Sequence, residues 1–327
     1  MDQELAVAKK GIDNLLSKIP DLKKAIHTQI IGQDDVIDQL IIGLIASGHV
    51  LLEGVPGLAK TLMVKTLAQS LNLDFNRIQF TPDLMPSDIL GTEIIQNDES
   101  GNKFLEFMKG PVFTNIILAD EINRTPPKTQ AALLELMQEY AVTYAGKQYL
   151  LDRPFFLLAT QNPIEQSGTF PLPEAQVDRF LLFIKVNYPT AAEEEEILKL
   201  TTGTEINEIK PVLSGSDILA LQRLCREVSI APDLVSQVSR MVRSTRPDQT
   251  NIGSVKNYVE WGAGPRAGQS LILAAKAHAL LKGRYAVIPE DIKSVLYPVL
   301  RHRLILNFKA SAENISIDHI ISQLELK

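Results

Sequence analysis

The chain has 327 residues, 45% of them hydrophobic and 22% charged, which is an ordinary composition for a globular protein. This length is enough for a large core and two domains. Its formal net charge of −6 gives no general reason to expect nucleic-acid binding. The single cysteine, Cys225, excludes a disulfide within the chain, suits a reducing compartment and lies in a helical pattern typical of a packed thiol.

No targeting or membrane segment is apparent. Residues 1–4 lack the charged and then apolar layout of a signal peptide. The most apolar window, residues 40–52, is interrupted by glycine, serine and histidine and is too short to cross a bilayer. We therefore expect a cytoplasmic protein without membrane insertion.

The first 28 residues show helical spacing, with Leu5 and Ile12 among the apolar positions. A second helix is predicted from the apolar positions between 36 and 44. A short segment just before it could fold over a nucleotide base, although a simple helix entry is the commoner meaning of such a sequence. This segment consists of Ile31, Gly32 and Gln33.

A glycine-containing turn is the first chemical landmark. Residues 49–52 predict a buried strand and residues 62–68 a helix, and between them lies Gly54-Val55-Pro56-Gly57-Leu58-Ala59-Lys60-Thr61. The backbone N–H groups of such a turn and the positive end of the helix dipole attract phosphate. Lys60 can reach the β- and γ-phosphates, and Thr61 can ligate Mg²⁺. An ordinary glycine turn is the alternative, and it is uncommon in this context.

One residue departs from the phosphate-loop pattern G-x-x-x-x-G-K-[ST], because Ala59 stands where the second glycine is expected. If the backbone there needs a positive φ, alanine costs about 1 kcal/mol. If the position is already helical, alanine costs nothing.

A strand, a helix and a hairpin are predicted next. Residues 74–80 alternate as a strand does, and residues 84–90 predict a helix. Two alternating runs, 92–96 and 103–107, flank the polar turn 97–101. They predict a hairpin inserted into an α/β framework.

Two carboxylates follow the apolar run 116–119, which predicts a strand buried on both faces, as in parallel sheets. Ligands of open α/β sheets bind at the carboxyl ends of the strands. Asp120 is placed to hold Mg²⁺ through water, and Glu121 to orient an attacking water. Carboxylates after strands are also common as solvated or capping residues. Their place downstream of a phosphate loop favours the site.

The chain then continues with a helix that has Pro126 at its first position, a second hairpin over 142–151 and a buried strand over 155–160. Asn162 follows that strand and could position the hydrolytic water. An asparagine in an ordinary turn is the usual alternative.

The last buried strand is predicted over residues 181–186, and Tyr188-Pro189 marks the expected domain boundary. This gives an α/β domain over 1–188 and an all-helical domain over 189–327. Residues 193–196 predict the solvated first turn of a capped helix. The helices of the second domain are expected at 191–201, 216–228, 232–245, 266–282 and 289–299.

Arg266 falls in the first turn of one of these helices. An arginine there does not stabilise its own helix end, so the position favours an anionic partner. That partner could be a bound phosphate or the carboxylate of a plain salt bridge.

In this order, the landmarks resemble an AAA+ ATPase over nearly the whole chain, and within that superfamily the MoxR group. Ala59 before Lys60 belongs to that group's pattern. The resemblance implies an α/β fold, with a parallel-sheet P-loop NTPase core and a C-terminal all-helical lid domain. The segments that carry it are 54–61, 120–124, 159–163, 172–180 and 264–267.

The resemblance also implies roles. Arg179 would be an arginine finger that enters the neighbouring subunit's site, with an ion pair to Asp178 as the alternative. Asn162 would be the first sensor and Arg266 the second. The complete candidate site is nucleotide binding by Ile31, Gly32, Gln33, Gly54, Val55, Pro56, Gly57, Leu58, Ala59, Lys60, Thr61 and Leu62, Mg²⁺ ligation by Thr61 and Asp120, and catalysis by Glu121, Asn162, Arg179 and Arg266.

Members of this family form ring-like oligomers, often hexamers, and are thought to act as chaperones that remodel or activate partner proteins. Some take part in metal-cofactor insertion, and their partners often carry von Willebrand factor A domains. The resemblance therefore implies a homo-oligomeric, Mg²⁺-dependent ATPase with a protein client, and the two hairpins match insertions near the central face of the ring. Three alternatives remain: a nucleotide-gated assembly module with little turnover, a nucleic-acid motor, and a chelatase subunit acting on a tetrapyrrole.

Overall fold

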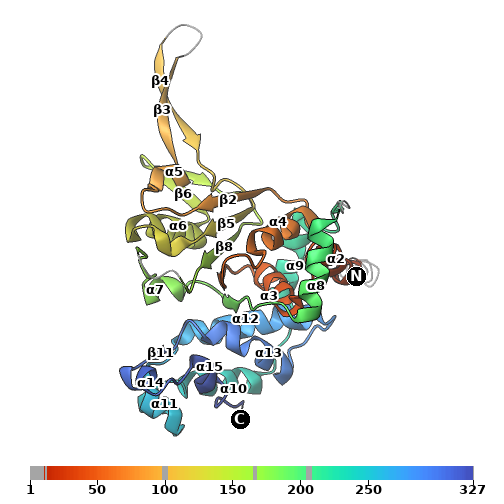
Figure 1. The fold of residues 1–327 in the computed structure, drawn as a ribbon, viewed down its shortest axis with the longest axis vertical. Helices are drawn as coiled ribbons and strands as arrows, with labels where there is room; N and C mark the ends of the chain where they lie inside the picture. Colours follow the sequence, from red (N-terminus) through yellow and green to blue (C-terminus); the bar gives the residue numbers. More distant parts are fainter. Residues whose placement is uncertain (1–10, 12, 98–101, 165–167, 204–207, 327) are drawn as a thin grey trace.

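The computed structural model describes residue 11 and residues 13–97, 102–164, 168–203 and 208–326. Its centre is a five-stranded sheet with the strand order β2-β5-β8-β1-β9 (Figure 1). All four neighbouring pairs are parallel, so the five carboxyl ends meet at one edge of the sheet. The strands are β1 (Val50–Glu53), β2 (Phe75–Gln79), β5 (Ile116–Asp120), β8 (Phe156–Gln161) and β9 (Leu182–Lys185).

The central strands are apolar on both faces, and alternate residues enter two separate cores. In β5, Ile116 and Leu118 join the cluster that includes α2, α3 and α4, whereas Ile117 and Ala119 join the cluster that includes α6. This is the burial pattern of a parallel sheet covered on both sides. The helices of this part are α2 (Ile19–His27), α3 (Asp34–Ile45), α4 (Lys60–Ser70), α5 (Pro86–Leu90), η1 (Ile122–Arg124), α6 (Pro127–Glu139) and α7 (Glu174–Val177).

Two antiparallel hairpins lie outside the main sheet. One joins β3 (Gly91–Asn97) to β4 (Lys103–Lys109), and the other joins β6 (Ala141–Tyr144) to β7 (Lys147–Leu150). The β3–β4 hairpin projects away from the body of the molecule (Figure 1). At its base Phe107 stacks on Tyr149 of the second hairpin, with ring centroids 4.2 Å apart.

Among its described residues, the C-terminal part has helices joined by loops, the short antiparallel pair β10–β11 and a single parallel bridge between Ser229 and Ala286. It is continuous with the first core cluster, because α12 packs against α3 and α13 packs against β9. Cys225 is buried on α9. The elements are α8 (Ala191–Thr202), α9 (Gly215–Glu227), α10 (Pro232–Arg243), η2 (Pro247–Gln249), α11 (Gly253–Tyr258), β10 (Val259–Trp261), α12 (Pro265–Leu281), α13 (Pro289–Leu300), β11 (Ile305–Leu306), α14 (Phe308–Ala312) and α15 (Ile317–Ile321).

These elements confirm the predicted fold class and the buried packing of Cys225. The helix predicted from residue 84 begins at Pro86, and the β10–β11 pair was not predicted because strands of two or three residues give no periodic pattern. Leu5, Ile12 and the turn residues 98–101 lie outside the described residues. No helix in the described part of the chain is long and apolar enough to cross a membrane.

Candidate nucleotide site

The loop between β1 and α4 has the backbone of a tight reversal. Gly57 has φ +86° and Ala59 has φ +53°, ψ +22°, so the position that departs from the glycine pattern is left-handed. The sequence left open whether Ala59 would be helical or strained, and the structure shows the strained conformation. Its cost is about 1 kcal/mol relative to glycine. α4 begins at the next residue, so the positive end of its dipole faces the loop.

Lys60 folds back into this loop. Its Nζ donates to the carbonyl oxygen of Gly54 and, at 3.3 Å, to that of Val55. Partial burial lowers the pKa of Lys60, and the carboxylates of Asp120 and Glu121 act in the opposite direction. The lysine, the loop and the two carboxylates are therefore close enough to act on one ligand.

Asp120 is almost buried at the end of β5, and both of its carboxylate oxygens have partners. Thr160 Oγ1 donates to Oδ1 at 2.5 Å, and Arg77 donates to Oδ2 from Nε at 2.9 Å and from Nη2 at 2.7 Å. Sequence reasoning missed Arg77. Its strand was predicted, but only the pairing of β2 with β5 shows that the side chain meets Asp120.

Glu121 has a different environment from its neighbour. Its backbone is left-handed, with φ +57°, and its N–H donates to Thr160 Oγ1 at 2.8 Å. Its Oε2 accepts from Gln79 Nε2 at 2.8 Å and from Arg124 Nη1 at 2.9 Å. Thr160 thus holds both acidic residues in place, while Gln79 and Arg124 fix the direction of the Glu121 carboxylate.

Asn162 follows β8, the strand between β5 and β1. It is 6% exposed, and its Oδ1 accepts from the N–H of Ile164 at 3.1 Å. Its Nδ2 has no hydrogen-bond partner among the described residues. A buried amide donor without a partner is costly, so this group is suited to a ligand or water at the sheet edge.

A cavity of about 330 Å³ adjoins the phosphate loop. Its walls come from the segment before α3, from the loop and from α8. Of the predicted nucleotide-binding residues, those that line it are Ile31, Gln33, Pro56, Gly57, Leu58, Ala59 and Leu62. Sequence reasoning missed the α8 wall, which contains Ile197, Leu198 and Thr201 next to Tyr188. Their helical spacing was the available signal.

Gly32 does not line this cavity, but its lack of a side chain allows residues 31–33 to pack against the start of α8. Its φ is +62°, and a Cβ at this position would come within 2.0 Å of Glu193 Oε1. Glu193 in turn caps α8, accepting from the N–H of Thr190 at 2.7 Å. Gln33 Nε2 donates to the carbonyl oxygen of Asn187 at 2.9 Å. The segment 31–33 is therefore held against the residues that lead into α8. The contact between Thr190 and Glu193 also confirms the predicted capped start of that helix.

The two arginines of the predicted site, Arg266 and Arg179, have different hydrogen-bond partners. Arg266, in the first turn of α12, donates from Nη1 to Asp178 Oδ2 at 3.2 Å. Arg179 donates from Nη1 to the carbonyl oxygen of Leu134 at 3.2 Å, and none of the described carboxylates forms an ion pair with it. Asp178 thus forms an ion pair with Arg266 and not with Arg179, the next residue in the sequence.

A phosphate loop after a central parallel strand, an acidic pair after a second strand and a polar amide after the strand between them define a P-loop nucleotide-binding protein. Known proteins agree. Residues 49–182 match the family described as "ATPase family associated with various cellular activities (AAA)", and residues 254–324 match the AAA lid domain.

Relatives extend the likeness over the whole chain. It is 45% identical to Chaperone MoxR1 of Mycobacterium tuberculosis, over 96% of this chain and 83% of that one. It is 31% identical to Protein MoxR of Paracoccus denitrificans, over 91% of each chain. A solved structure from Cytophaga hutchinsonii, described as a candidate ATPase, is 46% identical with a TM-score of 0.91, covering 98% of this chain and 96% of that one. The chain belongs to the MoxR family of AAA+ ATPases.

Proposed function

We propose that this protein hydrolyses ATP in a Mg²⁺-dependent reaction. The observation that carries the proposal is the meeting of three strand ends, β1, β8 and β5, which bring the Lys60 loop, Asn162 and the Asp120–Glu121 pair to one edge of the sheet. The adjoining apolar cavity offers room for a base.

Each residue then has a task. Lys60 binds the β- and γ-phosphates. Its ammonium donates to the neutral carbonyl oxygens of Gly54 and Val55, and the charged oxygens of a phosphate would be stronger acceptors. Glu121 orients the attacking water, and Asn162 supplies its free amide donors to water or phosphate. Arg266 approaches the γ-phosphate from the lid. Arg179, from a neighbouring subunit, adds positive charge as negative charge develops in the transition state.

The residues present fit Mg²⁺. A hydroxyl at Thr61 and a carboxylate at Asp120 are hard oxygen donors, and Asp120 is already paired with Arg77, which suits contact through water. Among the described residues no cluster of three His, Cys, Asp or Glu side chains could hold a metal alone. Held by Thr61 and Asp120, the ion would neutralise negative charge on the phosphates.

The wider role is proposed from the family. A relative 45% identical is named a chaperone, which supports a chaperone role for this protein. We propose a cytoplasmic location and a protein client that the chaperone remodels or activates. We propose a homo-oligomeric ring, with six subunits as the expected number, a client with a von Willebrand factor A domain, and metal-cofactor insertion as one form of activation. We also propose that the boundary between the α/β domain and the helical domain lies between residues 188 and 189.

A second candidate, a nucleotide-gated assembly module with little turnover, is favoured by one observation. Gln79 and Arg124 both hold the Glu121 carboxylate, which keeps the water-orienting group occupied until these contacts change.

One experiment tests the proposal. Lys60→Ala should weaken ATP binding at least about tenfold, because a charged hydrogen bond contributes about 1.5–3 kcal/mol. Glu121→Gln should keep the affinity and lose about 10²–10⁴ in turnover, as expected for a general base. Calorimetry and a phosphate-release assay measure the two, with Lys65→Ala, an exposed lysine on the same helix, as control. Negligible turnover in the unmodified protein with intact ATP binding would favour the gated module.

A further inference from the structure

Arg77 covers one oxygen of the Asp120 carboxylate, the group proposed to ligate Mg²⁺. It donates to Oδ2 from Nε at 2.9 Å and from Nη2 at 2.7 Å, while Thr160 donates to Oδ1. Lys60, a second cation whose charge interacts with that of Asp120, donates instead to the loop carbonyls of Gly54 and Val55. The positive charge in direct contact with Asp120 is therefore that of Arg77.

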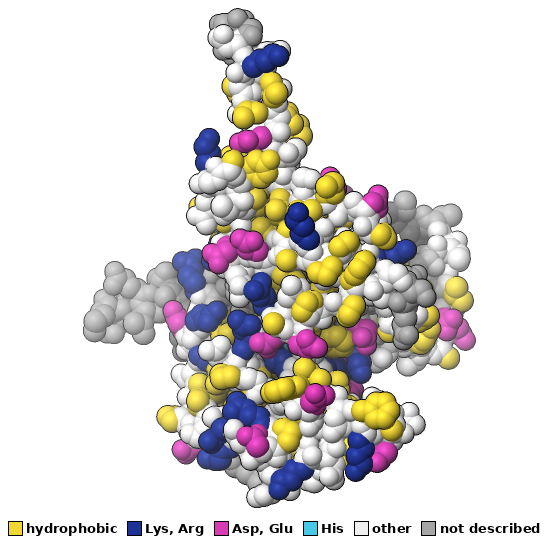
Figure 2. Space-filling model, turned by 90° about the vertical axis from the view of Figure 1, so that its left-hand side faces the viewer, with side chains coloured by type: hydrophobic (Ala, Val, Ile, Leu, Met, Phe, Trp, Pro, Cys, Tyr) yellow, Lys and Arg dark blue, Asp and Glu magenta, His cyan; other side chains and the backbone are white. Residues whose placement is uncertain are grey.

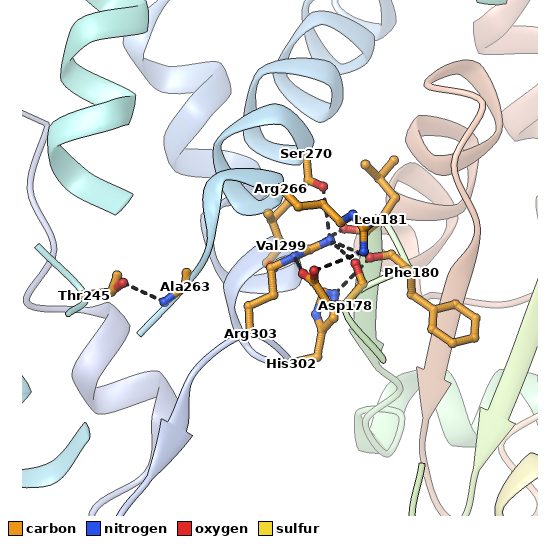
Figure 3. Close-up of polar contacts among 10 residues, drawn as sticks. All are labelled: Asp178, Phe180, Leu181, Thr245, Ala263, Arg266, Ser270, Val299, His302 and Arg303. Carbon is orange, nitrogen blue, oxygen red and sulfur yellow. Dashed lines mark hydrogen bonds and ion pairs between the residues drawn. The ribbon is translucent and has the colours of Figure 1, made fainter. Parts of the chain in front are cut away.

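The ion pair between Arg303 and Asp178 shows what a permanent contact looks like in this protein (Figure 3). The side chain of Arg303 is 1% exposed, and its Nε donates to Asp178 Oδ1 at 2.8 Å. A buried guanidinium that lost its carboxylate would be an uncompensated charge, which is strongly unfavourable. Its further acceptors are the carbonyl oxygens of Asp178, Phe180, Leu181 and Val299 and the hydroxyl of Ser270.

Arg77 is held much less firmly than Arg303. Its side chain is 46% exposed, and its Nη2 also donates to Gln79 Oε1 at 2.6 Å. Water can hydrate this guanidinium when it leaves the carboxylate, and an ion pair with an exposed member contributes little. The side chain of Asp120, in contrast, is 11% exposed. The arginine can therefore be exchanged for another cation, whereas the carboxylate stays in place.

A divalent cation at Asp120 would meet Arg77 as a competitor. Mg²⁺ carries twice the charge of a guanidinium and is bound in proteins through carboxylate oxygens, so it is the stronger partner for Asp120. An arginine that stays nearby repels the metal, because like charges repel more strongly as they approach and are screened poorly near a buried group. Removal of the Arg77 charge should therefore favour the metal.

We propose that Arg77 is the resting counter-ion of Asp120 and competes with Mg²⁺ for this carboxylate, so that Arg77 sets how tightly the site holds the metal. Arg77 is a positioning residue in this scheme, since it acts on the metal through Asp120. The inference rests on the proposed function, in which Thr61 and Asp120 hold Mg²⁺. The ion pair neutralises Asp120 as long as no metal is bound.

The test measures how much Mg²⁺ strengthens the binding of ADP, which is not turned over. The readout is the ratio of the ADP dissociation constants in EDTA and in Mg²⁺, determined by calorimetry. Arg77→Gln should raise this ratio about two- to fivefold, the worth of a partly exposed ion pair. Arg77→Lys keeps the positive charge and should leave the ratio unchanged. The control is Lys65→Gln, which removes an exposed positive charge on α4 and should also leave it unchanged.

The test also separates this inference from the proposed function. If Mg²⁺ strengthens ADP binding in the unmodified protein but the ratio is unchanged or lower in Arg77→Gln, only the inference is wrong, because an arginine that merely orients Asp120 would weaken metal binding when lost. If Mg²⁺ does not strengthen ADP binding in the unmodified protein, the assignment of Thr61 and Asp120 to the metal is wrong and the inference is overturned with it.

A second variant covers the possibility that Arg77→Gln unfolds the protein by leaving Asp120 unpaired. Asp120→Asn alone should lower the ratio, because the metal then meets the charge of Arg77 without the carboxylate. Adding Arg77→Gln removes both charges of the pair, and neutral replacements of ion pairs are often tolerated. This double variant should recover about two- to fivefold of the lost ratio. A thermal melt checks the fold, and a folded double variant without recovery contradicts the proposal.

Discussion

Three residues of the nucleotide site that are not glycine have a left-handed backbone, namely Gln33, Ala59 and Glu121, with φ of 58°, 53° and 57°. Each conformation costs about 1–2 kcal/mol for a residue with a Cβ. Strain of this kind persists only where the surrounding structure enforces it, and it gathers at functional sites. Here it turns the chain at the base segment, at the phosphate loop and after β5.

Ala59 allows this strain to be measured. Ala59→Gly should raise the free energy of unfolding by up to about 1 kcal/mol, because glycine relieves the left-handed conformation while adding some chain entropy to the unfolded state. Ala220→Gly, in the middle of α9, is the matched control and should lower it by about 1 kcal/mol. Chemical denaturation measures both. A loss of stability at position 59 equal to that at position 220 would contradict the strain.

At the level of single residues, sequence reasoning found the groups that follow strands but not their partners. Lys60, Asp120 and Asn162 could be placed because parallel strands put their carboxyl ends at one edge. Arg77 and Arg303 could not, because their contacts depend on which strands pair and on how the helical part packs. Neither the register of β2 with β5 nor the fit of residues 299–303 against residues 178–181 has a local signal.

At the level of elements, the exposed apolar side chains of the β3–β4 hairpin are the feature that the sequence predicted least well. Hydrophobic side chains lie along it among polar and charged ones, although it projects into solvent (Figure 2). Ile95 and Leu105 are opposite each other and are 68% and 63% exposed. Alternation predicted the hairpin itself, whereas its exposure could not be predicted, because apolar alternation normally means one buried face. Contiguous exposed apolar residues mark interaction sites.

This hairpin gives the next prediction. Ile95→Ser with Leu105→Ser should leave the fold, the state of assembly and basal ATP turnover at their original values, because surface substitutions usually change stability by less than about 0.5 kcal/mol. Turnover and the mass of the assembly by light scattering measure this, with Gln96→Ser on the same hairpin as control. Loss of basal turnover in an assembled protein would mean that the hairpin is a structural part of the assembly and not a contact for the proposed client.

At the level of the whole molecule, the two parts of the chain share one core cluster, and both line the cavity beside the phosphate loop. The base cavity takes walls from the N-terminal segment and from α8, and Arg266 reaches the segment 178–181 from α12. The elements that line this cavity were predicted one by one. That they line one cavity follows only from the tertiary packing.

Arg179 supplies the prediction at this scale. Arg179→Ala and Lys60→Ala proteins should each be inactive, since an arginine finger contributes about 10³–10⁵ in rate. Mixed assemblies should regain activity wherever an intact Arg179 faces an intact Lys60. The measurement is phosphate release after verified subunit exchange. If mixing restores nothing, Arg179 does not act on a neighbouring subunit.

The buried thiol of Cys225 has a practical consequence. Burial raises its pKa to about 11, so the thiol is protonated at neutral pH and, being buried, reacts poorly with thiol reagents. The chain carries no other cysteine. A cysteine introduced at Gln96 on the hairpin and another at Phe308, 86% exposed on α14, can then carry a donor and an acceptor dye without removing the native thiol. Energy transfer between them would report any change in the distance between the hairpin and α14 when nucleotide binds.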